Sequence, residues 1–130
     1  MDVPIFIFVV EDEHEIKDLL EDALEEGGFA VATAANGAQA IQMLEAADTD
    51  YRALVTDVHL PPGELTGWDV AKRARELNPE IPVVYMTGAA GNDWTSNGVP
   101  NSVLVPKPFA AAQVVTAVAQ LLNQGNTPGA

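Results

Sequence analysis

The sequence predicts a three-layer α/β domain, in which a parallel sheet of five strands is covered by helices on both faces. Two observations lead to this class. Five short apolar runs alternate with segments whose apolar residues recur at helical spacing. The apolar runs are also mostly continuous, as in strands that are buried on both faces. Strands that alternate with helices are joined by right-handed crossovers, so we expect every strand to be parallel to its neighbours.

The predicted strands are the five apolar runs. They are IFIFVV (5–10), VATA (31–34), ALVT (53–56), VVYM (83–86) and VLV (103–105). Each run is short enough to form a single strand of ordinary length.

Four predicted helices show apolar residues at helical spacing. The first ends at Gly27 and Gly28, because glycine commonly terminates helices. The apolar residues that mark the four helices are, in order, Ile16, Leu19, Leu20, Ala23 and Leu24; Ala38, Ile41 and Leu44; Val70, Ala71, Ala74 and Leu77; and Val114, Val115, Val118, Leu121 and Leu122. Residues 88–102 contain glycine and proline without a clear apolar period, so another helix there should be short, distorted or absent.

Length and composition limit the possible functions. The 130 residues fit one domain, which we place at residues 1–123, with a flexible tail at 124–130 and no output domain. The absence of cysteine excludes disulfides and thiolate chemistry. A net charge of −13 argues against direct nucleic-acid binding and favours a basic protein partner or a cation. No uncharged run is long enough to cross a membrane, and no basic leader opens the chain, so we expect a cytoplasmic protein.

Polar residues follow four of the five predicted strands. Glu11 and Asp12 follow the first strand, Asp57 the third, Thr87 the fourth and Lys107 the fifth. The carboxyl ends of parallel strands lie at one edge of the sheet, where such folds bind ligands. We therefore expect these side chains to share one crevice.

The chemistry of this set favours phosphoryl transfer to an aspartate. Three clustered carboxylates repel one another unless a proton or a cation neutralises them, and Mg²⁺ prefers oxygen ligands. A phosphoryl group on Asp57 would carry charge on three oxygens. The ammonium of Lys107, the hydroxyl of Thr87 and the metal are suited to neutralise that charge.

Four motifs resemble the signatures of the response-regulator receiver domain of two-component signalling, of the chemotaxis-regulator type. They are VVEDE, LVTDVHLP, VVYMTGA and VPKPF, and the resemblance covers residues 4–123. It implies a flavodoxin-like sheet of order 2-1-3-4-5 and transfer of a phosphoryl group to Asp57 from a histidine kinase or a histidine phosphotransfer protein. The domain would relay the signal to a downstream protein and assist its own phosphorylation and dephosphorylation, without being an enzyme in the ordinary sense.

The resemblance also assigns roles to the site residues. Mg²⁺ would be held by Glu11, Asp12, Asp57 and the backbone carbonyl of His59. Thr87 and Lys107 would contact the phosphoryl group, and the peptide bond between Lys107 and Pro108 would be cis. The side chain of His59 is expected at the rim of the site, whereas His14 is expected to be an ordinary surface residue.

Two departures from the family concern the output mechanism and the site entrance. Leu104 stands where receivers usually keep the aromatic residue that switches with the threonine. We therefore expect phosphorylation to order or shift residues 88–102 through Thr87 instead of rotating a ring. The loop from Leu60 to Trp68 is longer than usual and should overhang the site.

Other functions fit the sequence less well. A receiver excised from a hybrid kinase, acting within a phosphorelay, is the nearest alternative. A flavodoxin-like cofactor-binding module would need a phosphate-binding loop after the first strand, where this chain has EDEHE. A phosphohydrolase with an aspartyl nucleophile would carry it at that same position with a second aspartate two residues later. A purely structural interaction module would have lost the phosphorylation residues, all of which are present.

Overall fold

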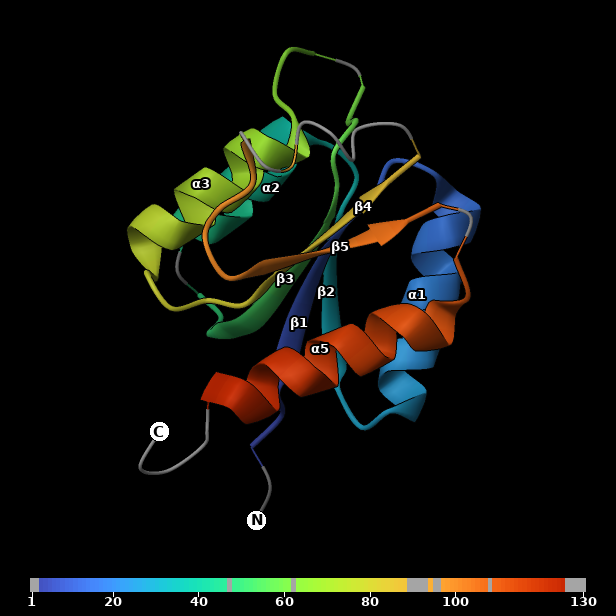
Figure 1. Ribbon diagram of the computed structural model, residues 1–130. Helices are drawn as coiled ribbons and strands as arrows, with labels where there is room; N and C mark the ends of the chain where they lie inside the picture. Colours follow the sequence, from blue (N-terminus) through green and yellow to red (C-terminus); the bar gives the residue numbers. More distant parts are fainter. Residues whose placement is uncertain are drawn as a thin grey trace.

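The sheet of the computed structural model, which describes residues 3–46, 48–61, 63–88, 94, 97–107 and 109–125, contains five parallel strands in the order β2-β1-β3-β4-β5. Helices cover both of its faces (Figure 1). The predicted fold class and strand order are confirmed. None of the helices in the described ranges has the length and apolar character needed to span a membrane.

The elements follow one another in strict alternation as far as β4. The strands are β1 (Phe6–Val10), β2 (Ala30–Ala34), β3 (Tyr51–Asp57), β4 (Val83–Thr87) and β5 (Ser102–Pro106). The helices are α1 (His14–Glu26), α2 (Gly37–Ala46), α3 (Gly67–Leu77) and α5 (Ala111–Gly125).

Two hydrophobic cores lie on opposite faces of the sheet, because successive side chains of a strand point to opposite sides. In β1, Phe8 and Val10 pack toward α2 and α3, whereas Ile7 and Val9 pack toward α1 and α5. Figure 1 shows α2 and α3 together on one face and α1 and α5 on the other. The continuous apolar run of β1 is explained by burial on both faces.

The two edge strands are less buried than their apolar runs predict. Most residues of β2 and β5 are only partly buried, whereas every residue of β4 is buried. Each edge strand has a neighbouring strand on one side only, and an apolar run does not show which strands will occupy the edges. The prediction that the strands are buried on both faces is therefore correct for the central strands alone.

Two predicted core positions are exposed. Leu19 of α1 is 52% exposed and Leu77 of α3 is 47% exposed. On α1 the fully buried residues are Leu20 and Leu24, so the buried stripe is narrower than predicted and leaves Leu19 outside it. Helical spacing indicates a face of the helix, but it does not show how far the neighbouring layer extends over that face.

The ends of the helices follow from local sequence. After α1, Phe29 N–H donates to the carbonyl of Leu24, and Gly28 adopts the positive φ of 96° that this type of helix end requires. At the start of α3, Thr66 and Asp69 form a reciprocal capping box. These contacts fix the end of α1 and the start of α3.

The segments after β4 and after α5 bear on two predictions. Gly98 N–H donates to the carbonyl of Trp94 at 2.8 Å. This is a helical hydrogen bond within residues 88–102, where a further helix is expected to be short, distorted or absent. Most of residues 89–96 lie outside the described ranges. Helix α5 runs to Gly125, two residues into the predicted tail, and residues 126–130 are outside the described part. The boundary between domain and tail therefore stays a prediction.

Candidate functional site

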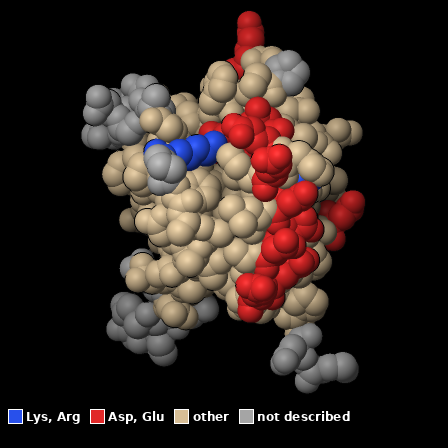
Figure 2. Space-filling model, turned by 90° about the vertical axis from the view of Figure 1, so that its right-hand side faces the viewer, with Lys and Arg blue, Asp and Glu red and all other residues tan. Residues whose placement is uncertain are grey.

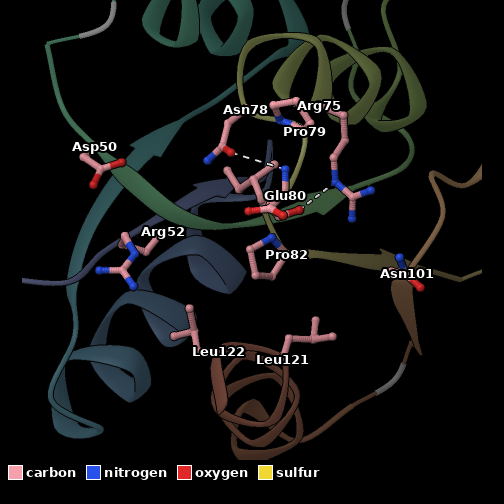
Figure 3. Close-up of a pocket in the computed structure, with 11 residues that line it drawn as sticks. Asp50, Arg52, Arg75, Asn78, Pro79, Glu80, Pro82, Asn101, Leu121 and Leu122 are labelled. Carbon is pink, nitrogen blue, oxygen red and sulfur yellow. Dashed lines mark hydrogen bonds between the residues drawn. The ribbon is translucent and has the colours of Figure 1, made fainter. Parts of the chain in front are cut away.

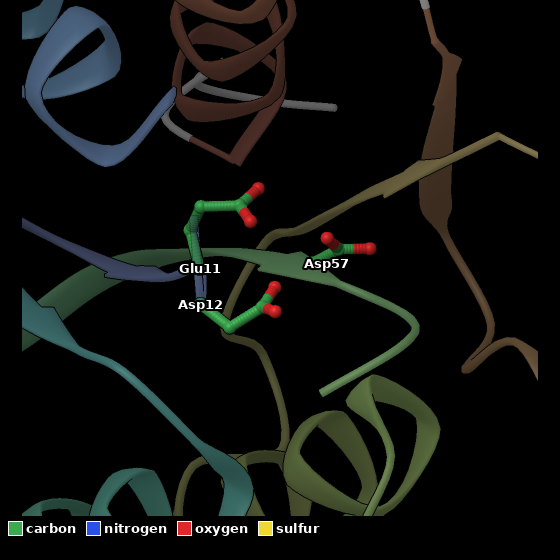
Figure 4. Close-up of side chains that lie close together, drawn as sticks. All are labelled: Glu11, Asp12 and Asp57. Carbon is green, nitrogen blue, oxygen red and sulfur yellow. The ribbon is translucent and has the colours of Figure 1, made fainter. Parts of the chain in front are cut away.

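The carboxyl edge of the sheet brings three acidic side chains together. Glu11 and Asp12 directly follow β1, and Asp57 is the last residue of β3. One carboxylate oxygen from each lies within 4.8 Å of those of the other two. Figure 4 shows the three carboxylates at the ends of adjacent strands, directed into a common space. The cluster predicted from the strand ends is therefore present, and its oxygen ligands suit a divalent cation.

Lys107 joins this cluster from the neighbouring side. Its Nζ donates to Asp57 Oδ2 at 2.8 Å and lies 3.5 Å from Glu11 Oε1. Burial lowers the pKa of Lys107, but the hydrogen bond and charge of Asp57, together with the charges of Glu11 and Glu13, raise it overall. The ammonium is therefore fixed as a cation between two of the acids.

Glu11 is buried to an unusual degree for an acid, because only 1% of the residue is exposed. Its Oε2 accepts a hydrogen bond from Glu13 N–H at 3.0 Å, whereas its Oε1 has no hydrogen-bond donor among the described residues. The contact of Oε1 with Lys107 has the distance of an ion pair but not the geometry of a hydrogen bond. Burial and the nearby charge of Asp57 raise the pKa of Glu11 to about 8, although the Glu13 N–H and Lys107 partly oppose this.

Asp57 is held by contacts on both carboxylate oxygens. Besides the bond from Lys107 to Oδ2, the backbone N–H of His59 donates to Oδ1 at 3.3 Å. The residue is 5% exposed. Its main chain is also fixed, because Val58 N–H donates to the carbonyl of Met86 in β4. Asp57 is thus an anchored carboxylate at the end of a central strand.

Gly67 contacts this aspartate directly, a contact that the sequence does not predict. A Cβ at position 67 would lie 2.1 Å from the carbonyl oxygen of Asp57. The N–H of Gly67 donates to the carbonyl of Val58 at 2.8 Å, so the first residue of α3 packs against the end of β3. The only sequence signal for this contact is a glycine at the start of a capped helix.

The remaining predicted residues take the following places. Thr87 is buried at the end of β4, one residue beyond Met86, which is the partner of Asp57 in the sheet. The N–H of Lys107 donates to the carbonyl of Thr87 at 2.8 Å. His14 is on the surface as predicted, with its side chain 76% exposed beside Asp18. Leu104 lies opposite Tyr85 in the β4–β5 pairing. Pro108, with its predicted cis peptide bond, lies outside the described residues.

A band of acidic side chains covers the face formed by α1 (Figure 2). The acids that α1 contributes to the surface include Glu15, Asp18, Asp22, Glu25 and Glu26. These residues fit the predicted solvated helix face. They also give the approach to the site a strongly negative potential, which favours a cation or a basic partner.

A cavity of about 680 Å³ lies at the opposite edge of the sheet, where the strands begin. None of the predicted site residues lines this cavity. Its walls come from the start of β3, the end of α3, the segment before β4 and the end of α5 (Figure 3). Charged residues of both signs line it, namely Asp50, Arg52, Arg75 and Glu80. It offers no cluster comparable to the one at the carboxyl edge.

Comparisons with known proteins agree with this arrangement. The family described as "Response regulator receiver domain" matches residues 7–119. The response regulator receiver protein CpdR of Brucella abortus is 29% identical over 118 residues, which cover 89% of this chain and 95% of CpdR. The probable transcriptional regulatory protein SilR of Salmonella typhimurium is 32% identical over 124 residues, covering 93% of this chain and 52% of SilR. The chain thus spans nearly all of one relative and about half of the other.

A solved structure shows the same fold. The crystal structure of a response regulator receiver protein from Sinorhizobium medicae WSM419 superposes with a TM-score of 0.87 at 41% sequence identity. The match covers 92% of this chain and 95% of that one.

Proposed function

Because this chain belongs to the response regulator receiver domain family of two-component signalling, we propose that Asp57 accepts a phosphoryl group from a phosphohistidine of a partner protein. The observation that carries the proposal is the setting of the Asp57 carboxylate. It lies 2.8 Å from the ammonium of Lys107 and within a cluster of two further carboxylates. An anchored, buried nucleophile with a cation beside it is the arrangement that phosphoryl transfer requires.

The transfer step exchanges one bond for another. An oxygen of Asp57 attacks the phosphorus, the new O–P bond forms as the N–P bond breaks, and the electron pair of the broken bond returns to the histidine nitrogen. The ammonium of Lys107 neutralises part of the negative charge on the phosphoryl oxygens, and the Thr87 hydroxyl donates a hydrogen bond to one of these oxygens. Lys107 needs no large movement for this role, since its Nζ already contacts the acceptor carboxylate.

The donor set also fits a magnesium ion. Glu11, Asp12 and Asp57 would hold it, together with the backbone carbonyl of His59 as the fourth ligand from the chain. The buried Glu11 Oε1, which has no hydrogen-bond donor in the described part of the chain, supports this assignment. Burying such an oxygen destabilises the fold unless a proton or a cation binds to it. When bound, Mg²⁺ supplies positive charge that offsets the repulsion between the carboxylates and the incoming phosphoryl group.

A phosphorylation assay tests the proposal. The protein is incubated with Mg²⁺ and acetyl phosphate, and its intact mass is measured. We expect one added phosphoryl group on the natural chain and none on Asp57→Ala. The variant Asp22→Ala makes the same acid-to-alanine change at an exposed position of α1 and should still be modified. No adduct on the natural chain, or an adduct that persists in Asp57→Ala, would contradict the proposal.

Signal output is proposed to pass through protein contacts. The acidic face over α1 favours a partner with a basic surface. The expected phosphoryl donor is a histidine kinase or a histidine phosphotransfer protein. A phosphotransfer profile against the kinases of the source organism would identify which donor acts.

A further inference from the structure

Tyr85 is a polar side chain in the middle of an otherwise apolar strand. It is completely buried, and its hydroxyl oxygen accepts a hydrogen bond from the backbone N–H of Val99 at 3.1 Å. Val99 is itself only 8% exposed. Burial raises the pKa of Tyr85, although the Val99 N–H and the charge of Arg75 oppose the shift. The phenol is therefore neutral at physiological pH and forms a fixed link between β4 and the segment before β5.

The same ring connects to the phosphoryl-acceptor site from two directions. Along β4, Thr87 lies two residues further on, so its side chain is on the same face of the sheet. Across the core, the Tyr85 ring packs against Trp68 with a distance of 4.6 Å between ring centroids. Trp68 directly follows Gly67, which lies against the carbonyl of Asp57. A shift of either β4 or the start of α3 would therefore reach Tyr85.

The segment held by Tyr85 has further polar contacts. Ser102 Oγ donates to the carbonyl of Val99 at 2.6 Å and accepts from Trp94 Nε1 at 2.9 Å. Arg75 Nη1 donates to the carbonyl of Pro100 at 2.7 Å. Residues 97–102 thus form a unit that is tied to the sheet by Tyr85 and to α3 by Arg75.

We propose that Tyr85 couples the occupancy of the Asp57 site to residues 97–102. In this chain the ring that links site and segment is on β4, and Leu104 of β5, its partner in the sheet, is aliphatic. The moving part is the hydrogen-bonded segment, and the ring stays in the core. This inference rests on the proposed phosphorylation of Asp57, and it identifies the contact through which that event reaches the segment before β5.

Tyrosine resonances provide the first test. The chain has two tyrosines, Tyr51 and Tyr85, so protein labelled with ¹³C at the ring carbon bearing the hydroxyl gives two signals. Tyr51→Phe assigns them and leaves Tyr85 intact. Addition of Mg²⁺ and beryllofluoride, a phosphoryl mimic, should shift the Tyr85 signal more than the Tyr51 signal. An unchanged Tyr85 signal in protein whose Asp57 is saturated with beryllofluoride would overturn the inference.

Amide exchange of a matched pair of variants provides the second test. Tyr85→Phe keeps the ring and removes the acceptor of Val99 N–H, whereas Tyr51→Phe removes a hydroxyl from the neighbouring strand. Without the mimic, the Val99 amide should exchange roughly five to ten times faster in Tyr85→Phe, as expected for the loss of one hydrogen bond. The response of residues 97–102 to beryllofluoride should fall to less than half in Tyr85→Phe and stay unchanged in Tyr51→Phe.

The outcomes separate the two proposals. Both variants should still gain one phosphoryl group from acetyl phosphate, since neither residue contacts the acceptor. If the natural chain gains none, the proposed function fails, and the coupling fails with it. If the natural chain is modified but Tyr85→Phe responds to beryllofluoride exactly as the natural chain does, only the coupling is wrong.

Discussion

Charged side chains lie both at the carboxyl edge of the sheet and at the opposite edge, where the strands begin. The two edges differ in how acidic and basic side chains are balanced. At the carboxyl edge, Glu11, Asp12 and Asp57 face Lys107, and Glu11 and Asp57 are buried. At the opposite edge, two acids and two arginines line a cavity, and the Arg75 guanidinium donates to the carbonyls of Ile81 and Pro100 at 2.7 Å each. The comparison shows that cavity size does not locate the site. A cluster in which buried acidic side chains outnumber their basic partners is a better indicator of the site.

The largest effect is expected where α3 contacts Asp57. Gly67→Ala would place a methyl group 2.1 Å from the Asp57 carbonyl oxygen, so the backbone has to shift. We expect the free energy of unfolding to fall by more than about 3 kcal/mol, as measured by urea denaturation, together with loss of phosphoryl uptake.

Gly88→Ala is the matched control at the same edge, because a Cβ there meets no atom of the described residues within 4 Å. It should change stability by no more than about 0.5 kcal/mol. Equal effects of the two substitutions would show that close packing against Asp57 is not what position 67 requires.

A pH titration tests whether the buried charge at the carboxyl edge is unbalanced. In the folded protein the pKa of Glu11 is raised from 4.5 to about 8, chiefly by burial. Between these values the folded state holds a proton that the unfolded state has released, so the stability that Glu11 contributes is fully present below pH 4.5 and is lost as the pH rises toward 8. Between pH 5 and 7 the loss attributable to Glu11 should be on the order of 2 to 3 kcal/mol in EDTA.

Glu11→Gln is the decisive comparison for this titration, because glutamine resembles the protonated acid and cannot release a proton. The decline between pH 5 and 8 should largely disappear in this variant. Saturating Mg²⁺ should also reduce the decline in the natural chain, since the cation replaces the proton. An identical decline in both proteins would exclude Glu11 as its source.

A smaller effect is expected at the opposite edge. Arg75→Ala removes two hydrogen bonds to backbone carbonyls and should cost about 1 to 2 kcal/mol in thermal or urea unfolding. Arg52→Ala, at an exposed position in the same cavity wall, should cost less than about 0.5 kcal/mol. Phosphoryl uptake by Asp57 should survive both substitutions. Loss of uptake in Arg52→Ala would mean that this edge takes part in the chemistry.

Most of the fold follows from sequence because its elements have strong signals. The run IFIFVV of β1 is buried on both faces, and its end places Glu11 and Asp12 at the site. Once the strands are taken as parallel, the positions after them must share one edge. The site residues Asp57, Thr87 and Lys107 could therefore be selected without coordinates.

Other features depend on three-dimensional packing and could not be predicted. The exposure of Leu19 depends on how far α5 extends across α1, and the partial burial of β2 depends on its place at the edge of the sheet. The contact between Tyr85 and Val99 joins residues 14 positions apart through a loop without periodicity. In the sequence, Tyr85 was simply another member of an apolar strand.

The distance along the chain between Asp57 and Lys107 has a consequence for biosynthesis. The two residues are 50 positions apart, and the N–H of Lys107 is bound to the carbonyl of Thr87 as β5 pairs with β4. A nascent chain that has not yet released residue 107 from the ribosome can contain all three acids but lacks the lysine that pairs with Glu11 and Asp57. Under the proposed function, competence to receive a phosphoryl group would be acquired only when the last strand docks, so a phosphoryl donor would encounter a responsive protein only after synthesis of the sheet is complete.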